Sequence, residues 1–294
     1  MTLDVIEVTR RFGDRTVLDQ VSLSVGTGRL TGFVGANGAG KTTAMRIVMG
    51  VLDATSGEVH WDGRPISRGD RAQFGYMPEE RGLYPKQQVA DQLSFFARLH
   101  GYDRERSTRR SDELLERLGL TERAKDRLDT LSLGNQQRVQ IAAALMHEPI
   151  ALVLDEPFSG LDPLAVDSMV ELLREQADAG VPALLSSHQL ELVERVCDDL
   201  VILAEGRVVA DGSVEELRRG ARTLHRLVLD ADAGWVRDVP GLSVHEVDGR
   251  VATLEVVEAG AARALLMQAM ERGSVEEFSR QVPRLADVFK EVVR

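Results

Sequence analysis

The sequence predicts an α/β protein with a parallel β-sheet core, an antiparallel β flap and a helical subdomain, followed by a small α+β domain. Short apolar runs of strand length alternate with segments whose apolar residues recur at helical spacing. A glycine-rich segment lies between one such run and a helix. Beyond residue 213 the strands alternate between apolar and polar residues instead of being continuously apolar. At 294 residues, the chain has the length of about two domains.

The composition indicates a globular protein and excludes several classes. A hydrophobic content of 43% and a charged content of 28% are ordinary for such proteins. A net charge of -11 argues against a nucleic-acid surface, so we expect no nucleic-acid partner. The single cysteine, Cys197, has no intramolecular disulfide partner, and no Cys/His spacing is typical of zinc. The sequence has neither a signal peptide pattern nor a run of about 20 apolar residues, so a membrane role would require a partner.

The first elements are two strands that form the flap. Residues 3–8 and 16–25 alternate with a period of two, and Gly13 and Asp14 between them are turn residues. Phe12 precedes that turn. From the residues alone its ring either packs in the flap or stacks on a nucleotide base, and packing is the favoured interpretation.

The glycine-rich segment follows the apolar run 30–34 and precedes a helix that reaches about residue 50. Glycine adopts backbone angles that other residues avoid, so successive N–H groups can surround a polyphosphate at the start of the helix. Lys41 supplies a charge for the β- and γ-phosphates, and Thr42 supplies a hydroxyl for Mg²⁺. The residues expected to bind the nucleotide here are Gly35, Asn37, Gly38, Ala39, Gly40, Lys41, Thr42 and Thr43.

The next elements complete the sheet and a helical subdomain at about residues 86–147. Strands are expected at residues 58–62, 74–77, 150–154 and 182–186, and helices at 89–100, 104–118, 141–146 and 163–179. The charged run 103–110 is expected on a solvated helix face. Strands that alternate with helices predict a parallel sheet with right-handed crossovers.

Two carboxylates follow the apolar run 150–154, at the sheet edge where ligands bind in α/β folds. Asp155 is expected to hold Mg²⁺ and Glu156 to polarise the attacking water. An Asp-Glu pair alone is more often a charged turn, but the glycine-rich loop favours the functional interpretation. His188 directly follows another buried strand and is placed to contact the γ-phosphate.

The C-terminal part predicts a small α+β unit. Ser213 is expected to cap a short helix, and residues 218–222 resemble a linker. Strands are expected at 224–229, 242–247, 251–257 and 274–278, and helices at 261–272 and 283–293. This order indicates a split βαβ arrangement.

The motifs together resemble the ATP-binding cassette (ABC) subunit of a transporter over about residues 1–218. The resemblance is carried by GANGAGKTT at 35–43 (Walker A), ALVLDE at 151–156 (Walker B), LSLGNQQ at 131–137 (signature), SGLD at 159–162 (D-loop) and His188 (switch histidine). It implies ATP and Mg²⁺ as ligands, ATP hydrolysis, and a Phe12 that stacks on adenine, which reverses the preference for core packing.

The resemblance also implies partners. In this family, two chains form a head-to-tail dimer in which the signature residues Ser132 and Gly134 and the D-loop residue Asp162 contact nucleotide held by the other copy. A helix that starts at Ser132 and Gly134 is a second anion site, which is consistent with such a dimer. A separate polytopic permease would hold the chain at the inner face of the cell membrane, with the chain itself in the cytoplasm.

The chain departs from the family pattern at two places. Glu79 stands where the family usually has glutamine; a carboxylate can still contact metal-bound water, but it adds negative charge near the triphosphate. The signature has Leu133 and Asn135 in place of the usual glycine and glutamine. The segment PEERGLYP at 78–85, together with the extra C-terminal unit, resembles bacterial sodium-extrusion and drug-resistance exporters.

Functions other than that of a transporter subunit explain fewer of the motifs in the sequence. A non-transport ABC ATPase, such as a ribosome-associated factor, is the main alternative, although such proteins usually carry two cassettes. A DNA-repair cassette protein would need a long coiled coil, and the sequence has no sustained heptad repeat. A phosphate-loop kinase would not account for the signature and the D-loop. Residues 222–294 are expected to form an accessory domain, which either regulates the cassette or is an inert cap. Sodium, drugs, peptides and lipids all remain open as substrates.

Overall fold

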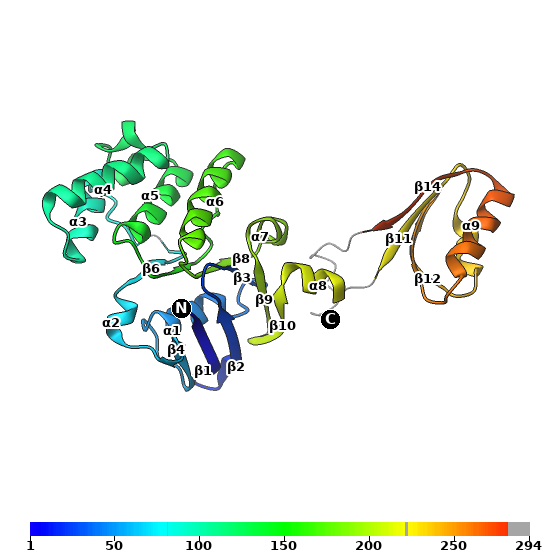
Figure 1. Cartoon of the computed structure of the whole chain (residues 1–294), viewed down its shortest axis with the longest axis horizontal. Coiled ribbons are helices and arrows are strands. Elements are labelled where there is room, and N and C mark those ends of the chain that lie inside the picture. The colour runs from blue at the N-terminus through cyan, green and yellow to red at the C-terminus, as the bar shows by residue number, and fades with distance from the viewer. Residues whose placement is uncertain (81, 221–222, 282–294) are drawn as a thin grey trace. The chain divides into compact units, whose positions relative to one another are not determined.

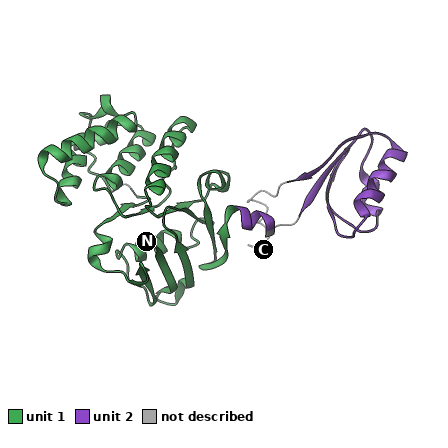
Figure 2. Cartoon of the chain, in the orientation of Figure 1, with its two compact units in different colours: residues 1–214, 293 green, residues 215–292, 294 purple. Residues whose placement is uncertain are grey.

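The computed structural model describes residues 1–80, 82–220 and 223–281. The chain forms two compact units, residues 1–214 and 215–292 (Figure 2). The expected helix at 283–293 lies outside the described residues.

The first unit is built on a six-stranded sheet of order β10-β9-β3-β8-β7-β6. The strands are β3 (Leu30–Val34), β6 (Phe74–Met77), β7 (Ala151–Leu154), β8 (Ala183–Ser187), β9 (Asp199–Ala204) and β10 (Arg207–Ser213). Every residue of β3, β7 and β8 is buried, which explains their mostly apolar sequences. All strand pairs are parallel except β9 with β10. The expected parallel core is therefore present, but the sequence did not predict β9 or the antiparallel edge strand β10.

The flap is a four-stranded antiparallel sheet of order β2-β1-β4-β5. It consists of β1 (Leu3–Phe12), β2 (Arg15–Val25), β4 (Ser56–Trp61) and β5 (Arg64–Pro65). The β1–β2 pairing runs from Leu3 opposite Val25 to Phe12 opposite Arg15. Apolar side chains of the flap, of helix α1 (Lys41–Val48) and of the main sheet form one buried cluster, so α1 is fixed between the two sheets.

The helical subdomain contains α3 (Val89–Leu99), α4 (Arg104–Arg117) and α5 (Leu133–Leu145), which group together in Figure 1, with the short turns η1 (Thr121–Arg123) and η2 (Leu128–Thr130). Helix α5 is longer than the expected apolar segment 141–146 because Ser132 caps its start, where its hydroxyl accepts a hydrogen bond from the Asn135 N–H. The remaining helices of the unit are α2 (Arg68–Arg71), α6 (Pro163–Asp178) and α7 (Leu190–Val196). No helix in the described part of the chain has both the length and the apolar character required to cross a bilayer.

In the described part of the second unit, a four-stranded antiparallel sheet of order β12-β13-β11-β14 packs with one long helix. Its elements are α8 (Val214–Gly220), β11 (Leu224–Leu229), η3 (Gly234–Asp238), β12 (Leu242–Asp248), β13 (Val251–Val256), α9 (Ala261–Arg272) and β14 (Val275–Gln281). This is the strand order of a split βαβ sandwich, except that the first crossover carries only the short turn η3 instead of an α-helix. Leu227, Leu254 and Leu265 lie at the centre of its own hydrophobic core.

Candidate functional site

The glycine-rich loop joins the end of β3 to the start of α1. Gly40 has φ +113°, and a Cβ at this residue would lie 2.6 Å from Leu18 Cδ2 in β2. A Cβ on Gly35 would lie 2.4 Å from the Leu203 carbonyl oxygen in β9. Since a side chain at either position would collide with a neighbouring strand, only glycine lets the loop run this close to the sheet. The loop thereby leads into the N-terminus of α1, where backbone N–H groups favour an anion.

Lys41 is the first residue of α1 and is only 7% exposed. Its Nζ donates hydrogen bonds to the carbonyl oxygens of Gly35 at 2.7 Å and Ala36 at 3.3 Å. The loop itself therefore holds the ammonium at the phosphate-binding end of the helix. A buried cation in this position is suited to bind the phosphate oxygens of a nucleotide.

Asp155 and Glu156 directly follow β7 and are both buried, as the sequence predicted for the sheet edge. The Ser186 hydroxyl joins them, because it donates to Asp155 Oδ1 and accepts a hydrogen bond from the Glu156 N–H at 2.8 Å. Ser186 thus fixes both carboxylates at the end of the strand. The charge of Asp155 also acts on its surroundings: burial, and secondarily this charge, raises the pKa of Tyr76.

His188 follows β8, the neighbour of β7 in the sheet. Its Nδ1 lies 2.9 Å from Glu156 Oε1, although 47% of the histidine side chain is exposed. The structure therefore brings His188 to the candidate general base. The other edge of the ring is available to a ligand from solvent.

These elements surround a cavity of about 480 Å³. It is lined by Arg15, Val17, Asn37, Gly38, Gly40, Lys41, Thr42, Thr43, Glu79, Asp155 and Glu156. The Thr42 hydroxyl donates to Glu79 Oε2 at 3.4 Å, so the loop after β6 reaches the glycine-rich loop. Most of the predicted phosphate and metal residues therefore converge on one site.

The donor set around this cavity fits a hard divalent cation. Asp155 Oδ2 is buried without a hydrogen-bond partner among the described atoms, and an unpaired buried carboxylate oxygen is costly unless a ligand satisfies it. Oxygen donors from Thr42, Asp155 and Glu79 suit Mg²⁺, which takes its other ligands from phosphates and water. Within the described ranges no group of three or more His, Cys, Asp or Glu side chains could hold a metal unaided. The site therefore fits a cation that arrives with a nucleotide.

Phe12 does not pack in the core, and its ring is 48% exposed. The Arg10 guanidinium lies over the ring, 4.4 Å from its centroid, and donates to the Asp53 carbonyl oxygen at 2.9 Å. The initial preference for core packing, drawn from the residues alone, was therefore wrong. An exposed aromatic ring opposite Arg15, which lines the cavity, is consistent with base stacking.

The signature residues lie outside this cavity, next to the segment 159–162. A Cβ on Gly134 would approach the Gly160 carbonyl oxygen at 3.2 Å, and the Arg138 guanidinium lies 3.8 Å from the Asp162 carboxylate. Ser132 and Asp162 each cap a helix, α5 and α6 respectively. Within one chain, these residues form a second surface and do not complete the first site.

Three residues of the site were absent from the sequence predictions. Arg15 and Val17 line the cavity from β2, and Ser186 holds the two carboxylates. The sequence could have indicated Ser186, because this residue lies at the end of an apolar strand just before His188. It could not have indicated Arg15 and Val17, since their part of the flap is an ordinary alternating strand.

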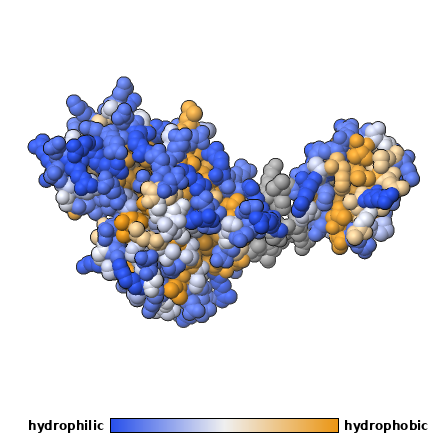
Figure 3. Space-filling view, in the orientation of Figure 1, coloured by the Kyte–Doolittle hydropathy of each residue, from blue (hydrophilic) through white to orange (hydrophobic). Residues whose placement is uncertain are grey.

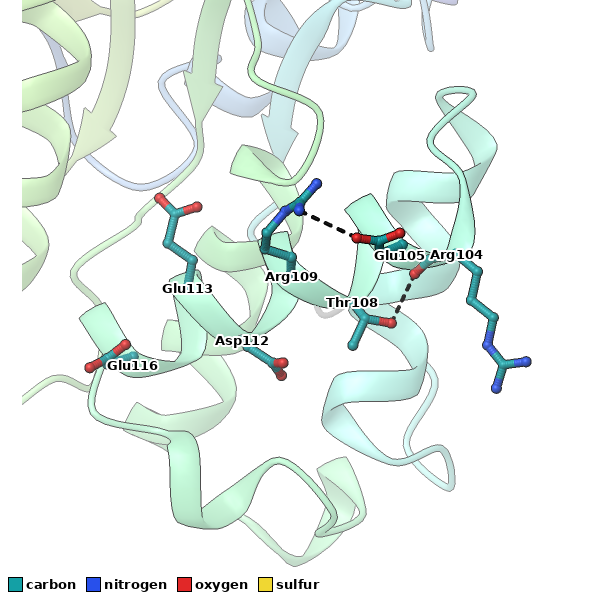
Figure 4. Close-up of a pocket in the computed structure, with 7 residues that line it drawn as sticks. All are labelled: Arg104, Glu105, Thr108, Arg109, Asp112, Glu113 and Glu116. Atoms are coloured by element: carbon teal, nitrogen blue, oxygen red, sulfur yellow. Dashed lines mark hydrogen bonds and ion pairs between the residues drawn. The ribbon is translucent and has the colours of Figure 1, made fainter.

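A larger hollow, of about 790 Å³, lies on the surface of α4. All of its lining residues belong to this one helix, and their side chains diverge from it in Figure 4. Arg109 lies 3.6 Å from Glu105 on the next turn, and the Thr108 hydroxyl donates to the Arg104 carbonyl oxygen. The predicted charged run is thus a solvated helix face, which offers no enclosed site.

Comparisons with known proteins agree with this geometry. Residues 18–159 match the family model described as ABC transporter, and residues 212–293 match the one described as ATP-binding protein DrrA1-3-like, C-terminal domain. A relative from Bacillus subtilis (strain 168), the uncharacterized ABC transporter ATP-binding protein YhaQ, is 36% identical over 99% of this chain and 98% of its own length.

Two further matches cover about three quarters of this chain. The linearmycin resistance ATP-binding protein LnrL of Bacillus subtilis (strain 168) is 33% identical over 77% of this chain and 75% of its own length. A solved structure described as an ATP binding subunit of an ABC transporter superposes with a TM-score of 0.69 at 34% identity. That match covers 75% of this chain and 95% of the solved one.

Proposed function

Because the chain belongs to the ATP-binding proteins of ABC transporters, which bind and hydrolyse ATP, we propose that it energises a bacterial exporter through a separate membrane subunit. The observation that carries the proposal is the cavity in which Lys41, Thr42, Asp155 and Glu156 meet. The match of the whole chain to one relative supports the transporter role, and the resistance function in the name of another supports export. Residues 1–218 are proposed as the ATPase domain and 222–294 as an accessory domain.

The proposed reaction is the transfer of the γ-phosphoryl group of ATP to water. Lys41 would bind the β- and γ-phosphates, and Thr42, Asp155 and Glu79 would hold the Mg²⁺ ion. When bound, Mg²⁺ neutralises charge on the phosphate oxygens. Glu156 accepts a proton as the water oxygen bonds to the γ-phosphorus and the bond to the β–γ bridging oxygen breaks. The products are ADP and inorganic phosphate.

His188 is proposed to orient Glu156 and to contact the γ-phosphate. Its Nδ1 lies 2.9 Å from Glu156 Oε1, within hydrogen-bonding distance. The histidine side chain is 47% exposed, so its second nitrogen is open to a phosphate oxygen. One side chain would thus connect the general base to the group being transferred.

A second copy of the chain is the proposed dimer partner. Ser132 and Gly134 stand at the start of α5, outside the cavity of their own chain, and Leu133 between them is 59% exposed. A helix N-terminus binds anions, and the γ-phosphate of an ATP held by the other copy would supply one. Asp162 lies on the same surface, close to Arg138. The head-to-tail arrangement would therefore close around two ATP molecules.

Glu156→Gln tests both the base and the dimer. An amide does not accept the proton, so ATP should still bind while hydrolysis falls by about 100-fold or more. Gel filtration with Mg-ATP should then show a dimer, since the bridging γ-phosphate persists. A variant that binds ATP but stays monomeric at high concentration would contradict the head-to-tail arrangement.

An exposed aromatic patch on the helical subdomain is the proposed contact for the membrane subunit. We define it as Tyr84, Phe95, Phe96 and Leu99. The rings of Tyr84 and Phe96 are stacked with centroids 6.4 Å apart, and Phe95 lies 5.8 Å from Phe96. Tyr84 is 50%, Phe95 40% and Leu99 65% exposed. Clustered exposed aromatic side chains are typical of protein interfaces.

Co-purification from a detergent extract tests the partner. The chain should retain a polytopic membrane protein, and Phe95→Asp should weaken this retention because it places a charge in the patch. Val51→Asp is the matched control, since Val51 is 67% exposed but lies outside the patch. Recovery of ribosomes and no membrane protein would instead support the non-transport ATPase. Retention would also support the proposed association of the chain with the cell membrane through this partner.

A further inference from the structure

Glu156 has an uncommon backbone conformation. Its φ angle is +51°, in the left-handed region that residues with a side chain rarely adopt. Such a conformation persists only where the surrounding structure holds it in place. The residue is also 9% exposed and follows immediately after β7. The contacts that hold this turn therefore decide the direction in which its carboxylate points.

Two side chains hold the backbone of Glu156 from opposite ends. On the amino side, its N–H donates to Ser186 Oγ at 2.8 Å. On the carboxyl side, the Gln137 Nε2 donates to the Glu156 carbonyl oxygen at 2.9 Å and to the Pro157 carbonyl oxygen at 3.1 Å. A single amide that binds two successive carbonyl oxygens fixes the orientation of both peptide planes.

Gln137 reaches this turn from α5, a different part of the chain. The helix starts after its cap residue Ser132, and Gln137 lies in its second turn. One turn further, the Gln140 amide donates to the Pro78 carbonyl oxygen, at the end of the neighbouring strand β6. One face of α5 is therefore attached to the carboxyl ends of both β6 and β7.

We propose that Gln137 is a positioning residue that holds the left-handed turn at Glu156 and so directs the carboxylate toward the cavity. The inference rests on the proposed role of Glu156 and adds a residue that does not touch the substrate. Gln137 does not line the cavity, so its removal leaves the phosphate-binding residues unchanged. Without the amide, the turn relaxes toward ordinary backbone angles and the carboxylate moves away from the attacking water.

The test is Gln137→Met, which keeps the length of the side chain and removes the donor. The kcat for ATP should fall by about ten-fold or more, as expected for a displaced base, while the ATP dissociation constant stays within about two-fold of the wild type. The matched control is Gln73→Met, since the Gln73 amide also donates to a backbone carbonyl, that of Gly69, but on the exposed helix α2. The control should keep full turnover.

A double variant separates positioning from general structural support. In the Glu156→Gln background, Gln137→Met should cause no further loss of turnover, because the group that Gln137 positions is already inactive. An additional ten-fold loss, or a parallel loss of ATP affinity, would overturn the inference. If Gln137→Met does not fold, Gln137→Ala is measured by the same criteria.

The outcomes also separate this inference from the proposed function. If Glu156→Gln loses turnover while Gln137→Met keeps it, only the positioning role is wrong. If Glu156→Gln keeps full turnover, the assignment of Glu156 as the base is wrong, and the inference fails with it.

Discussion

The ammonium of Lys41 shows how single residues prepare the site for its ligand. It is almost fully buried, and the carbonyl oxygens of Gly35 and Ala36 accept its hydrogen bonds. Neutral carbonyl groups compensate a buried charge only in part, whereas a phosphate carries the opposite charge. The loop therefore holds a cation that gains most from a bound polyphosphate.

Lys41→Ala should abolish productive ATP binding. Loss of a buried charged partner costs several kcal/mol, so the dissociation constant should rise on the order of 100-fold or more. Isothermal titration calorimetry measures this directly. Lys86→Ala is the matched control, because Lys86 is exposed and does not line the cavity. Wild-type affinity in Lys41→Ala would refute the assignment.

Glu79→Gln tests the carboxylate that the family pattern does not contain. The residue lines the cavity and accepts a hydrogen bond from Thr42. Its neutralisation removes a negative charge near the metal and the triphosphate, so the Mg²⁺ concentration at half-maximal ATPase activity should shift several-fold. The exposed neighbour Glu80 provides the control variant Glu80→Gln. If the Mg²⁺ titrations of both variants superimpose on that of the wild type, Glu79 is excluded from the metal site.

At the scale of elements, α5 connects Ser132 and Gly134, the turn at Glu156 and a stacked histidine pair. His147 follows the C-terminus of the helix, and its ring stacks on His100 with centroids 3.8 Å apart. Both line a cavity of about 280 Å³ beside β6. Burial, and then the nearby His100, lowers the pKa of His147 to about 4. Burial also lowers the pKa of His100.

This pair should make the stability of the first unit depend on pH. The unfolded chain binds a proton at His147 near pH 6.5, whereas the folded chain does so near pH 4. The contribution of the neutral ring to stability is thus complete above about pH 6.5 and is lost as the pH falls toward 4. Between about pH 7.5 and pH 5, the loss should be roughly 1–2 kcal/mol.

The measurement compares urea unfolding of the wild type and His147→Gln at these two pH values. The variant should lose less stability on acidification, because glutamine does not titrate. An identical pH dependence in both proteins would show that His147 is not responsible.

At the scale of the whole molecule, the second unit carries an independent core, and the described residues that line the ATP cavity all come from the first unit. The buried residues of the second unit come from β11, β13, η3 and α9, together with loop residues Ala233 and Val239. Apolar side chains gather on its visible face in Figure 3, and Val257, Met267 and Met270 are more than half exposed. Exposed apolar residues of this kind are typical of an interaction surface. The sequence predicts either a regulatory or dimer-stabilising role for this unit or an inert cap.

A chain that ends after Arg219 should still fold and bind ATP. The residues that line the cavity, from Arg15 to Glu156, together with His188, all lie in the first unit, whose sheet remains complete. Circular dichroism and ATP titration check this expectation. A folded but non-binding chain would show that the boundary is wrong.

The same shortened chain distinguishes the two roles of the second unit. Reduced dimerisation or altered ATPase regulation would support the accessory role. Unchanged ATPase activity, dimerisation and transport would instead indicate an inert cap.

The sequence alone determined the features that depend on neighbouring residues. A strand followed by a glycine-rich loop and a helix predicts a phosphate site, because backbone geometry over a few residues creates it. A buried strand followed by Asp155 and Glu156 predicts carboxylates at a sheet edge, since parallel strands end at the same edge. The five motifs in order were sufficient to predict the family that the comparisons then showed.

Only the tertiary structure decided which distant residues meet. Glu79 reaches Thr42, Ser186 joins Asp155 to Glu156, and Gln137 holds the turn after β7. The residues of each pair are separated by 19 or more positions, so no local pattern encodes their contact. The order in which strands and helices pack brings these pairs together, because side chains from adjacent elements then share one sheet edge. The tertiary structure likewise decided that Phe12 is exposed, since the alternation of a strand alone does not show where the flap ends.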